Sequence, residues 1–188
     1  MRIGEALGLT WDDVNLQTGE ICVVRQRLRR NYFDTPKTET STRSFYADAS
    51  LISYLRSLKA TQATNEIRYG EAYQMVYEDV ENDHAIVILP KKIPRPHGCT
   101  PRPLICVKPG GLIYVHDTLK NALRRLGLNS HSFRHTHATR LIEAGAKPVD
   151  VAARLGHADA TITQNLYTHD TEEMKKETAR IFERLVDK

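Results

Sequence analysis

The sequence lacks the features of several protein classes. No apolar run approaches the roughly 18 residues that a membrane-spanning helix needs, and the N-terminus has no charged-then-apolar secretory pattern. The three cysteines, Cys22, Cys99 and Cys106, are odd in number and form no C-x-x-C pair. Neither a disulfide framework nor a cysteine zinc site is therefore predicted. These absences favour a cytoplasmic protein with no membrane partner.

The composition is that of a globular chain, and its charge is concentrated locally. With 188 residues, 40% of them hydrophobic and 27% charged, the sequence can form one domain with a sizeable core. The net charge of +4 says little about a partner, but residues 25–43 carry an excess of cations over Asp34 and Glu39. These cations are Arg25, Arg27, Arg29, Arg30, Lys37 and Arg43. Such a patch is typical of a surface that follows a phosphate backbone, and a solvated strand face is the alternative.

The pattern of apolar residues predicts an α+β fold that is mainly α, with a small antiparallel sheet. A helix is expected over 2–9, a strand over 21–33, and a hairpin that places Lys37 near its tip before the short strand 43–46. Residues 48–79 are expected to be mostly helical. Six of the eight prolines lie between Pro90 and Pro109, which favours a loop or insertion over 90–110.

From Val115 onward the pattern is helical throughout. Helices are expected from His116 to a stop at Gly127, from a Ser130 cap to Gly145, and from Pro148 to Gly156, with further helices beyond residue 158. The second of these helices begins with HSFRHTHATRLIEAG, which is unusually rich in histidine and arginine. Two interpretations compete for this run, a metal site and a phosphate site.

The phosphate interpretation fits the spacing better. His131 and Arg134 stand three apart in a first helical turn, beside backbone N–H groups that favour an anion. His131 and His135 could also hold zinc, but Ser132 replaces the glutamate of the H-E-x-x-H pattern, and Arg134 would repel a cation. His135 and His137 are interpreted as packing or supporting groups. No metal and no cofactor are predicted.

Four motifs together resemble a known family. The run H-x-x-R at His131 is followed by L-G-H with His157, and then by Tyr167 with T-H after it. This order resembles the C-terminal signature of tyrosine recombinases of the phage-integrase type. RIGEALGLTW is similar to the segment that carries the family's first arginine, and TPKTETSTR is similar to its β-hairpin lysine. The motifs keep the family's order over residues 2–169.

The resemblance implies an active site and a role for each member. Arg2 and Arg134 would bind the phosphate, and Glu5 would orient Arg2 by a helical ion pair. Tyr167 would be the nucleophile, His131 would take its proton or help to hold the phosphate, and Lys37 would protonate the departing oxygen. His157 would hydrogen-bond a non-bridging oxygen. The implied set is Arg2, Lys37, His131, Arg134, His157 and Tyr167, with no metal or nucleotide.

The resemblance also implies partners and an organisation. Residues 1–188 would form a catalytic domain, without the family's N-terminal core-binding and arm-binding domains. The partner would be double-stranded DNA in a bacterial cytoplasm, with a tetramer on paired DNA sites in the full-length form. The expected activity is site-specific DNA recombination through a 3′-phosphotyrosyl intermediate. An inactive DNA-binding remnant, a type IB topoisomerase-like enzyme and a metal-dependent nuclease are the alternatives.

Overall fold

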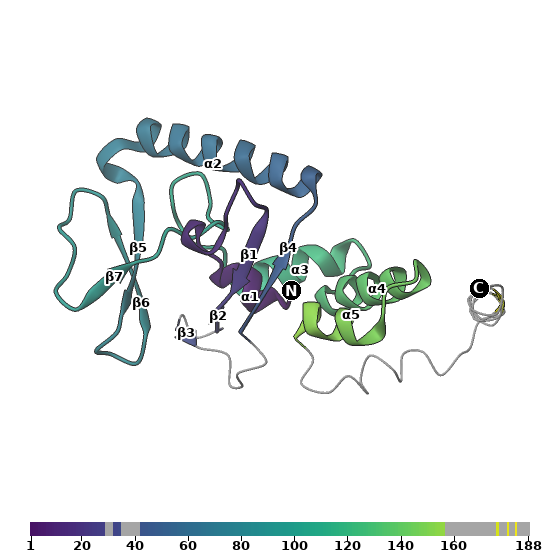
Figure 1. Cartoon of the computed structure of the whole chain (residues 1–188). Coiled ribbons are helices and arrows are strands. Elements are labelled where there is room, and N and C mark those ends of the chain that lie inside the picture. The colour runs from purple at the N-terminus through teal and green to yellow at the C-terminus, as the bar shows by residue number, and fades with distance from the viewer. Residues whose placement is uncertain (29–31, 35–41, 157–175, 177–179, 181–182, 184–188) are drawn as a thin grey trace.

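The computed structural model describes residues 1–28, 32–34, 42–156, 176, 180 and 183 (Figure 1). The predicted site residues Lys37, His157 and Tyr167 lie outside these ranges, as do Arg29 and Arg30. The helices predicted beyond residue 158 fall almost wholly outside them as well. Among the helices that are described, none combines the length and the apolar character needed to cross a membrane.

The first helix, α1, runs over Ile3–Gly8, and its start is closed by a carboxylate. The Arg2 backbone amide donates to Glu5 Oε2 at 2.7 Å, which satisfies an amide that the helix start leaves free. After α1 comes the 3₁₀ helix η1 (Trp11–Asp13), where Asp13 accepts from the amide and hydroxyl of Thr10 at 2.9 and 2.7 Å. Two adjacent helix starts thus use the same device. The predicted helix at the start of the chain is confirmed.

The strand expected over 21–33 is divided into short pieces. β1 (Glu20–Val23) pairs antiparallel with β4 (Arg43–Tyr46), with Val23 opposite Arg43. β2 (Gln26–Arg27) pairs with β3 (Phe33–Asp34) instead. The predicted antiparallel arrangement is confirmed, but the expected single strand is interrupted, because residues 24 and 25 belong to neither β1 nor β2. Arg27 is buried and Leu28 is exposed.

The helical prediction over 48–79 is correct only in its first part. α2 spans Ala49–Tyr69, and Asp48 caps it by accepting from the Leu51 amide. After the 3₁₀ helix η3 (Gly70–Ala72), the chain forms a sheet of β5 (Gln74–Asp79), β6 (Ala85–Pro90) and β7 (Cys99–Pro101), in the order β6-β5-β7. The helix predicted to end near residue 79 is therefore wrong, because residues 85–90 supply an antiparallel partner. β7 likewise lies inside the segment expected to be a loop.

The β5–β6–β7 sheet supports the base of the hairpin that precedes residue 35. The buried carboxylate of Glu78 is contacted by the side chains of Arg102 and His84. The carbonyl of His84 in turn accepts from the Phe33 amide of β3 at 3.0 Å. The contact between His84 and Glu78 is therefore linked, through the His84 backbone, to β3, which precedes Lys37 in the sequence.

The last described elements are three helices, as predicted. They are α3 (His116–Arg125), α4 (Ser130–Glu143) and α5 (Pro148–Leu155). The cap of α4 is Asn129 rather than the predicted Ser130. Gly156 ends α5 in the left-handed conformation, with φ of 68°, which favours glycine. The described part of the chain is thus α+β and mainly helical, as expected.

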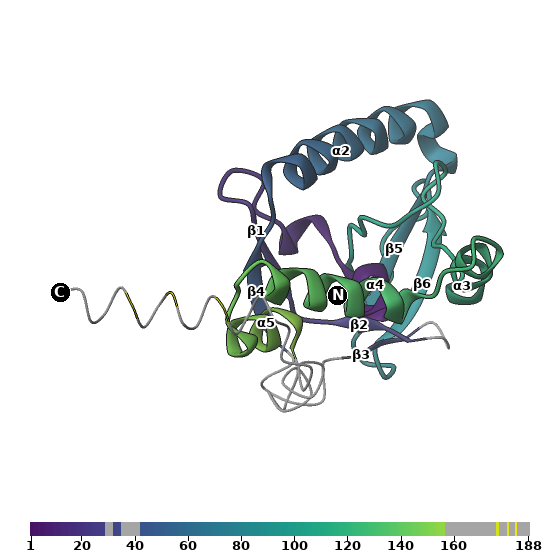
Figure 2. The same ribbon diagram turned by 90° about the vertical axis from the view of Figure 1, so that its right-hand side faces the viewer.

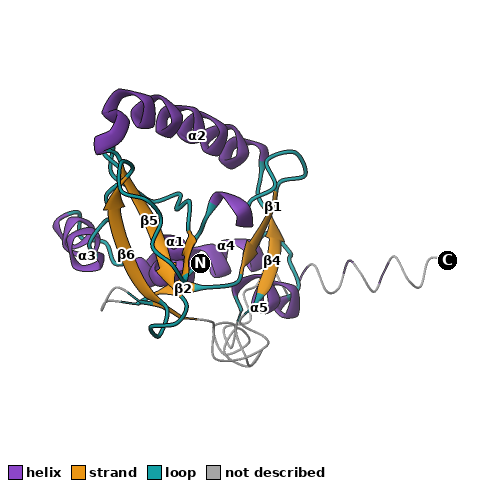
Figure 3. Cartoon of the chain, turned by 90° about the vertical axis from the view of Figure 1, so that its left-hand side faces the viewer, coloured by secondary structure: helices purple, strands orange, loops and turns teal. Residues whose placement is uncertain are grey.

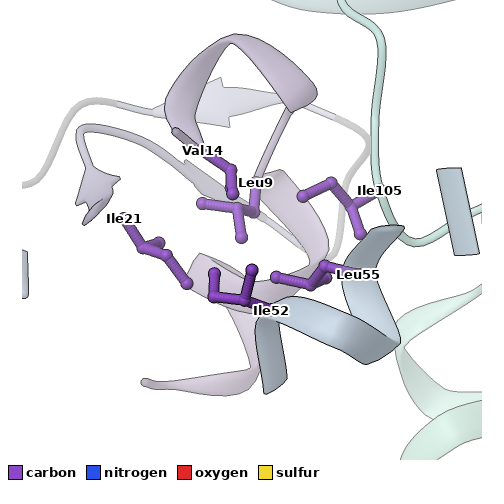
Figure 4. Close-up of a cluster of buried hydrophobic side chains, with 6 residues drawn as sticks. All are labelled: Leu9, Val14, Ile21, Ile52, Leu55 and Ile105. Carbon is purple, nitrogen blue, oxygen red and sulfur yellow. The ribbon is translucent and has the colours of Figure 1, made fainter. Parts of the chain in front are cut away.

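Three separate apolar clusters form among the described residues. The first joins α2 to the N-terminal segments through Ile52 and Leu55 (Figure 4). The second packs Phe33 against the three-stranded sheet. The third lies between α4 and α5, around Ala138 and Leu155. α2 runs across both the β1–β4 pair and the three-stranded sheet (Figures 1 and 3), while α4 lies beside the N-terminus in each view (Figure 2).

Candidate active site

A single buried carboxylate joins two arginines from distant parts of the chain. Glu5 is 3% exposed, and its Oε1 lies 3.1 Å from Nη1 of Arg2 on the neighbouring turn. Its Oε2 accepts from Nη2 of Arg43 in β4 at 2.9 Å, and Oε1 accepts from Nη1 of Arg43 at 3.3 Å. The predicted Arg2–Glu5 ion pair is therefore present, and Arg43 adds a second cation to it.

The surroundings keep the Glu5 carboxyl ionised. Burial by itself would raise its pKa, but the hydrogen bonds from Arg43 and from the Arg2 amide, together with both positive charges, outweigh burial. The net result is a pKa below the ordinary value. Glu5 therefore stays a charged acceptor, and Arg2, whose side chain is 45% exposed, remains open to solvent beside it.

Arg134 completes a cationic cluster around Glu5. It lies on α4, and its guanidinium donates to the backbone carbonyl of Leu155 at the end of α5. Burial lowers the pKa of Arg134 to about 10, the positive charges of Arg2 and Arg43 act in the same direction, and Glu5 opposes them. Arg2 and Arg43 bind the Glu5 carboxylate, and Arg134 lies near enough to be affected by all three charges. Positive charge therefore exceeds negative charge among these four residues, which suits an anion.

The end of α5 is held by two of these arginines. Arg43 donates from Nε to the carbonyl of Arg154 at 2.9 Å, and Arg134 donates to the next carbonyl, that of Leu155. The last carbonyls of a helix have no partner within it and carry partial negative charge, so guanidinium groups stabilise them. The cluster therefore also fixes the point from which the chain continues toward His157 and Tyr167.

His131 lies at the start of α4, in a setting that differs from the expected one. The Asn129 side chain accepts from the amides of His131 at 2.8 Å and Ser132 at 2.9 Å. The prediction that these amides are free for an anion is therefore wrong, because the helix cap occupies them. The exposed His131 ring instead borders a hollow of about 390 Å³, lined by Asn129, His131, Ser132, His135 and Thr136.

The other histidines of α4 contact neighbouring side chains. His137 accepts from Nε of Arg154 at 3.3 Å, and burial, followed by the charge of Arg154, lowers its pKa. His135 lies 3.4 Å from the hydroxyl of Thr139. Within the described ranges, no three side chains of His, Cys, Asp or Glu gather in a way that could hold a metal ion.

Those arginines of the expected basic patch that the structure describes have partners inside the protein. Arg25 forms an ion pair with Asp13 and donates to the Thr10 hydroxyl at 3.1 Å. Arg27 is 2% exposed and donates to the carbonyl of Tyr114. For Arg27 and Arg43 the predicted open DNA-binding face is wrong, because folding buries both guanidinium groups. Sequence reasoning missed the contact between Arg43 and Glu5, since no spacing along the chain connects positions so far apart.

Comparison with known proteins finds relatives of one kind. Residues 113–174, which include α4 and α5, match the phage integrase family. A tyrosine recombinase XerC-like protein of Caldanaerobacter subterraneus subsp. tengcongensis is 28% identical to the chain, covering 90% of the chain and 42% of that relative. Both matches are to tyrosine recombinases of the phage-integrase type. The family predicted from the four motifs is confirmed.

One integrase is similar to the chain in sequence, and another is similar in fold. The integrase of Staphylococcus phage L54a is 26% identical, covering 99% of the chain and 49% of that protein. In fold, the chain is similar to the integrase of transposon Tn1549, solved in complex with transposon right-end DNA, with a TM-score of 0.67 and 21% identity. That match covers 99% of the chain and 55% of the Tn1549 chain. The chain thus spans about half the length of the phage-integrase-family proteins that it matches.

Proposed function

We propose that residues 1–188 form the catalytic part of a site-specific DNA recombinase, an integrase of a prophage or mobile element. The observation that carries this proposal is the gathering of Arg2, Arg43 and Arg134 around Glu5. The family resemblance assigns Arg2 and Arg134 to phosphate binding and Glu5 to the orientation of Arg2. The excess positive charge suits the phosphodiester of a DNA strand.

Arg2 and Arg134 are the two residues that bind the phosphate. Attack on a phosphodiester increases the negative charge on its non-bridging oxygens, and a guanidinium can donate two parallel hydrogen bonds to them. Arg2 lies beside a carboxylate that keeps it oriented. Arg134 is destabilised in its charged form by burial and by the nearby cations, so a bound anion relieves part of that cost.

The covalent step uses residues beyond the described ranges. The Tyr167 hydroxyl attacks phosphorus, a bond forms between its oxygen and phosphorus, and the bond to the 5′-oxygen breaks. His131 takes the tyrosine proton, and Lys37 gives a proton to the departing 5′-oxygen. His157 donates to a non-bridging oxygen. Attack by a 5′-hydroxyl of another strand reverses these steps and joins the exchanged strands.

The same proposal includes the partner and the assembly. Double-stranded DNA is the substrate, and the complete protein acts as a tetramer on paired sites in the bacterial cytoplasm. The chain's relatives include integrases, and a protein of similar fold was solved with DNA, which supports DNA as the partner. No metal or nucleotide takes part in the proposed steps.

A covalent adduct with DNA tests the proposal directly. The chain is incubated with a pool of nicked duplexes of randomised sequence, in which the short fragment released by cleavage diffuses away and prevents religation. Denaturing gels should show a protein–DNA adduct that is lost in Tyr167→Phe and kept in Tyr54→Phe, a change at an exposed tyrosine of α2. Adduct formation should be unaffected by EDTA.

Other outcomes separate the alternatives. Binding without any adduct identifies a DNA-binding remnant, and cutting that EDTA abolishes identifies a metal-dependent nuclease. If an adduct forms, the recovered sites are placed on supercoiled plasmids. Joining of two sites supports a recombinase, whereas relaxation without joining supports a type IB topoisomerase-like enzyme.

A further inference from the structure

The guanidinium group of Arg43 is used for contacts within the protein and is not available to contact DNA. Its side chain is 6% exposed. Nη1 and Nη2 donate to the two oxygens of Glu5, and Nε donates to the carbonyl of Arg154. All three nitrogens of the guanidinium are therefore engaged, and they connect β4 to both α1 and α5.

The space around this guanidinium is closed on the side of α5. A Cβ built on Gly156 would lie 2.8 Å from Nη1 and 3.0 Å from Cζ of Arg43. Gly156 also has a positive φ, so the end of α5 approaches the guanidinium as closely as a residue without a side chain permits. The position of Arg43 is thus fixed from two directions, by Glu5 and by the end of α5.

Both neighbours of Arg43 lead to proposed catalytic residues. Glu5 binds Arg2, and α5 ends at Leu155, two residues before His157. The carbonyl of Leu155, next to the one that Arg43 holds, is bound by Arg134. Arg43 is therefore linked to Arg2 through Glu5, and to Arg134 through the end of α5 that both arginines bind.

We infer that Arg43 is a positioning residue for strand cleavage, which aligns Arg2 through Glu5 and fixes the end of α5 beside Arg134. This inference rests on the proposed function, and it replaces the DNA contact that the basic run 25–43 predicted for Arg43. Arg43 itself does not touch the substrate. Without the two hydrogen bonds from Arg43, Glu5 is bound only to the half-exposed Arg2. The guanidinium groups of Arg2 and Arg134 are then no longer held in a fixed position relative to each other.

Kinetics and salt dependence distinguish positioning from DNA contact. Arg43→Gln and Arg43→Lys are compared with Arg140→Gln, a change at an arginine on α4 whose side chain is 79% exposed. Misplacement of reacting groups predicts a cleavage rate at saturating DNA that falls by about a hundredfold in both Arg43 variants. DNA affinity and its dependence on salt should stay as in the wild type. A direct phosphate contact instead predicts weaker binding and a salt slope smaller by about one.

An NMR measurement tests the contact without relying on cleavage. The carboxyl carbon of Glu5, assigned through Glu5→Gln, should titrate at a higher pH in Arg43→Gln and Arg43→Lys. The Nε–H signal of Arg2, assigned through Arg2→Lys, should shift as well, with neither change in Arg140→Gln. Folding is checked by circular dichroism, and Arg43→Lys retains the charge should Arg43→Gln fail to fold.

The two measurements separate the possible failures. Unchanged Glu5 and Arg2 signals overturn the assignment of Arg43, whatever the enzyme does. Shifted signals with an unchanged cleavage rate overturn its part in catalysis. An absent adduct in the wild type overturns the proposed function, and the NMR result then decides only whether Arg43 orders the arginine cluster.

Discussion

Arg134 donates a hydrogen bond to the carbonyl of Leu155, so a proposed phosphate ligand also closes the end of α5. Its charge is nevertheless unfavourable where it stands, because burial, with the charges of Arg2 and Arg43, lowers its pKa to about 10. The hydrogen bond and the repulsion act on stability with opposite signs. A site suited to an anion is thus built at some cost to the empty protein.

Arg134→Gln should therefore separate stability from activity. The change removes a hydrogen bond to a carbonyl, worth about 1 kcal/mol, and also removes the repulsion between like charges. We expect the free energy of unfolding in urea to stay within about 1 kcal/mol of the wild type, while adduct formation is lost. Arg125→Gln, at the exposed end of α3, is the control. A large loss of stability would show that the hydrogen bond outweighs the repulsion.

Acid should destabilise the protein partly through Glu5. The folded protein holds the pKa of this carboxyl below the ordinary value of 4.5, so it binds the proton more weakly than the unfolded chain does. The resulting stabilisation is complete above about pH 4.5 and is lost as the pH falls through the folded pKa. Urea unfolding at pH 7 and below pH 4.5 should show a smaller difference in Glu5→Gln than in the wild type. An equal difference would mean that Arg43 and Arg2 do not stabilise the ionised form.

Gly8→Ala should weaken the contact between α1 and β2. A Cβ at Gly8 would lie 3.0 Å from the Arg27 nitrogen and 3.1 Å from the Gln26 carbonyl carbon, both backbone atoms. Alanine favours a helix over glycine by up to about 1 kcal/mol, but overpacking against backbone costs about 1–3 kcal/mol. We expect a net loss in the free energy of unfolding, together with slower adduct formation because α1 carries Glu5. Ser57→Ala on exposed α2 should be neutral or stabilising, and a stabilised Gly8→Ala would contradict the close approach.

Gln62→Ala should loosen α2 from the segments beneath it. Gln62 accepts from Nε1 of Trp11 at 2.7 Å and donates to the carbonyl of Ile105 at 2.6 Å, on one side of a cavity of about 280 Å³. Loss of both bonds should cost about 1–3 kcal/mol. Trp11 is the single tryptophan, so its fluorescence emission should move to longer wavelength as the ring gains water. Arg68→Ala, farther along α2, should change neither quantity.

The elements that the sequence predicts well are those with local signals. The apolar spacing of α3 to α5, with Pro148 at a helix start and Gly156 at its end, predicts these helices to within a residue or two. The strand β5 could not be distinguished from a helix in the same way, because its short run becomes a strand only through its pairing with residues 85–90. Asn129 replaced Ser130 as a cap for a similar local reason, since either side chain can accept from the helix amides.

The site shows the same division between local and distant contacts. The ion pair between Arg2 and Glu5 could be predicted because the two residues are three apart on one helix. The charges at Arg25, Arg27 and Arg43 suggested an open basic face, since the sequence gives no sign of the acids and carbonyls that meet them after folding. Charge along a sequence therefore identifies candidate DNA contacts, but the fold decides which of these charges bind partners inside the protein.

The separation of the apolar clusters has a consequence for how DNA would act on the protein. Among the described residues the α4–α5 cluster is separate from the other two, and Arg43 of β4 bridges the seam between α5 and the N-terminal part of the chain, beside Arg134, which joins α4 to α5. A phosphate seated among those groups would screen their mutual repulsion and bind only when both sides of the seam are in place. Bound DNA would then hold α4 and α5 against the rest of the chain. It would raise the melting temperature and slow hydrogen exchange in α4 and α5 more than in α2.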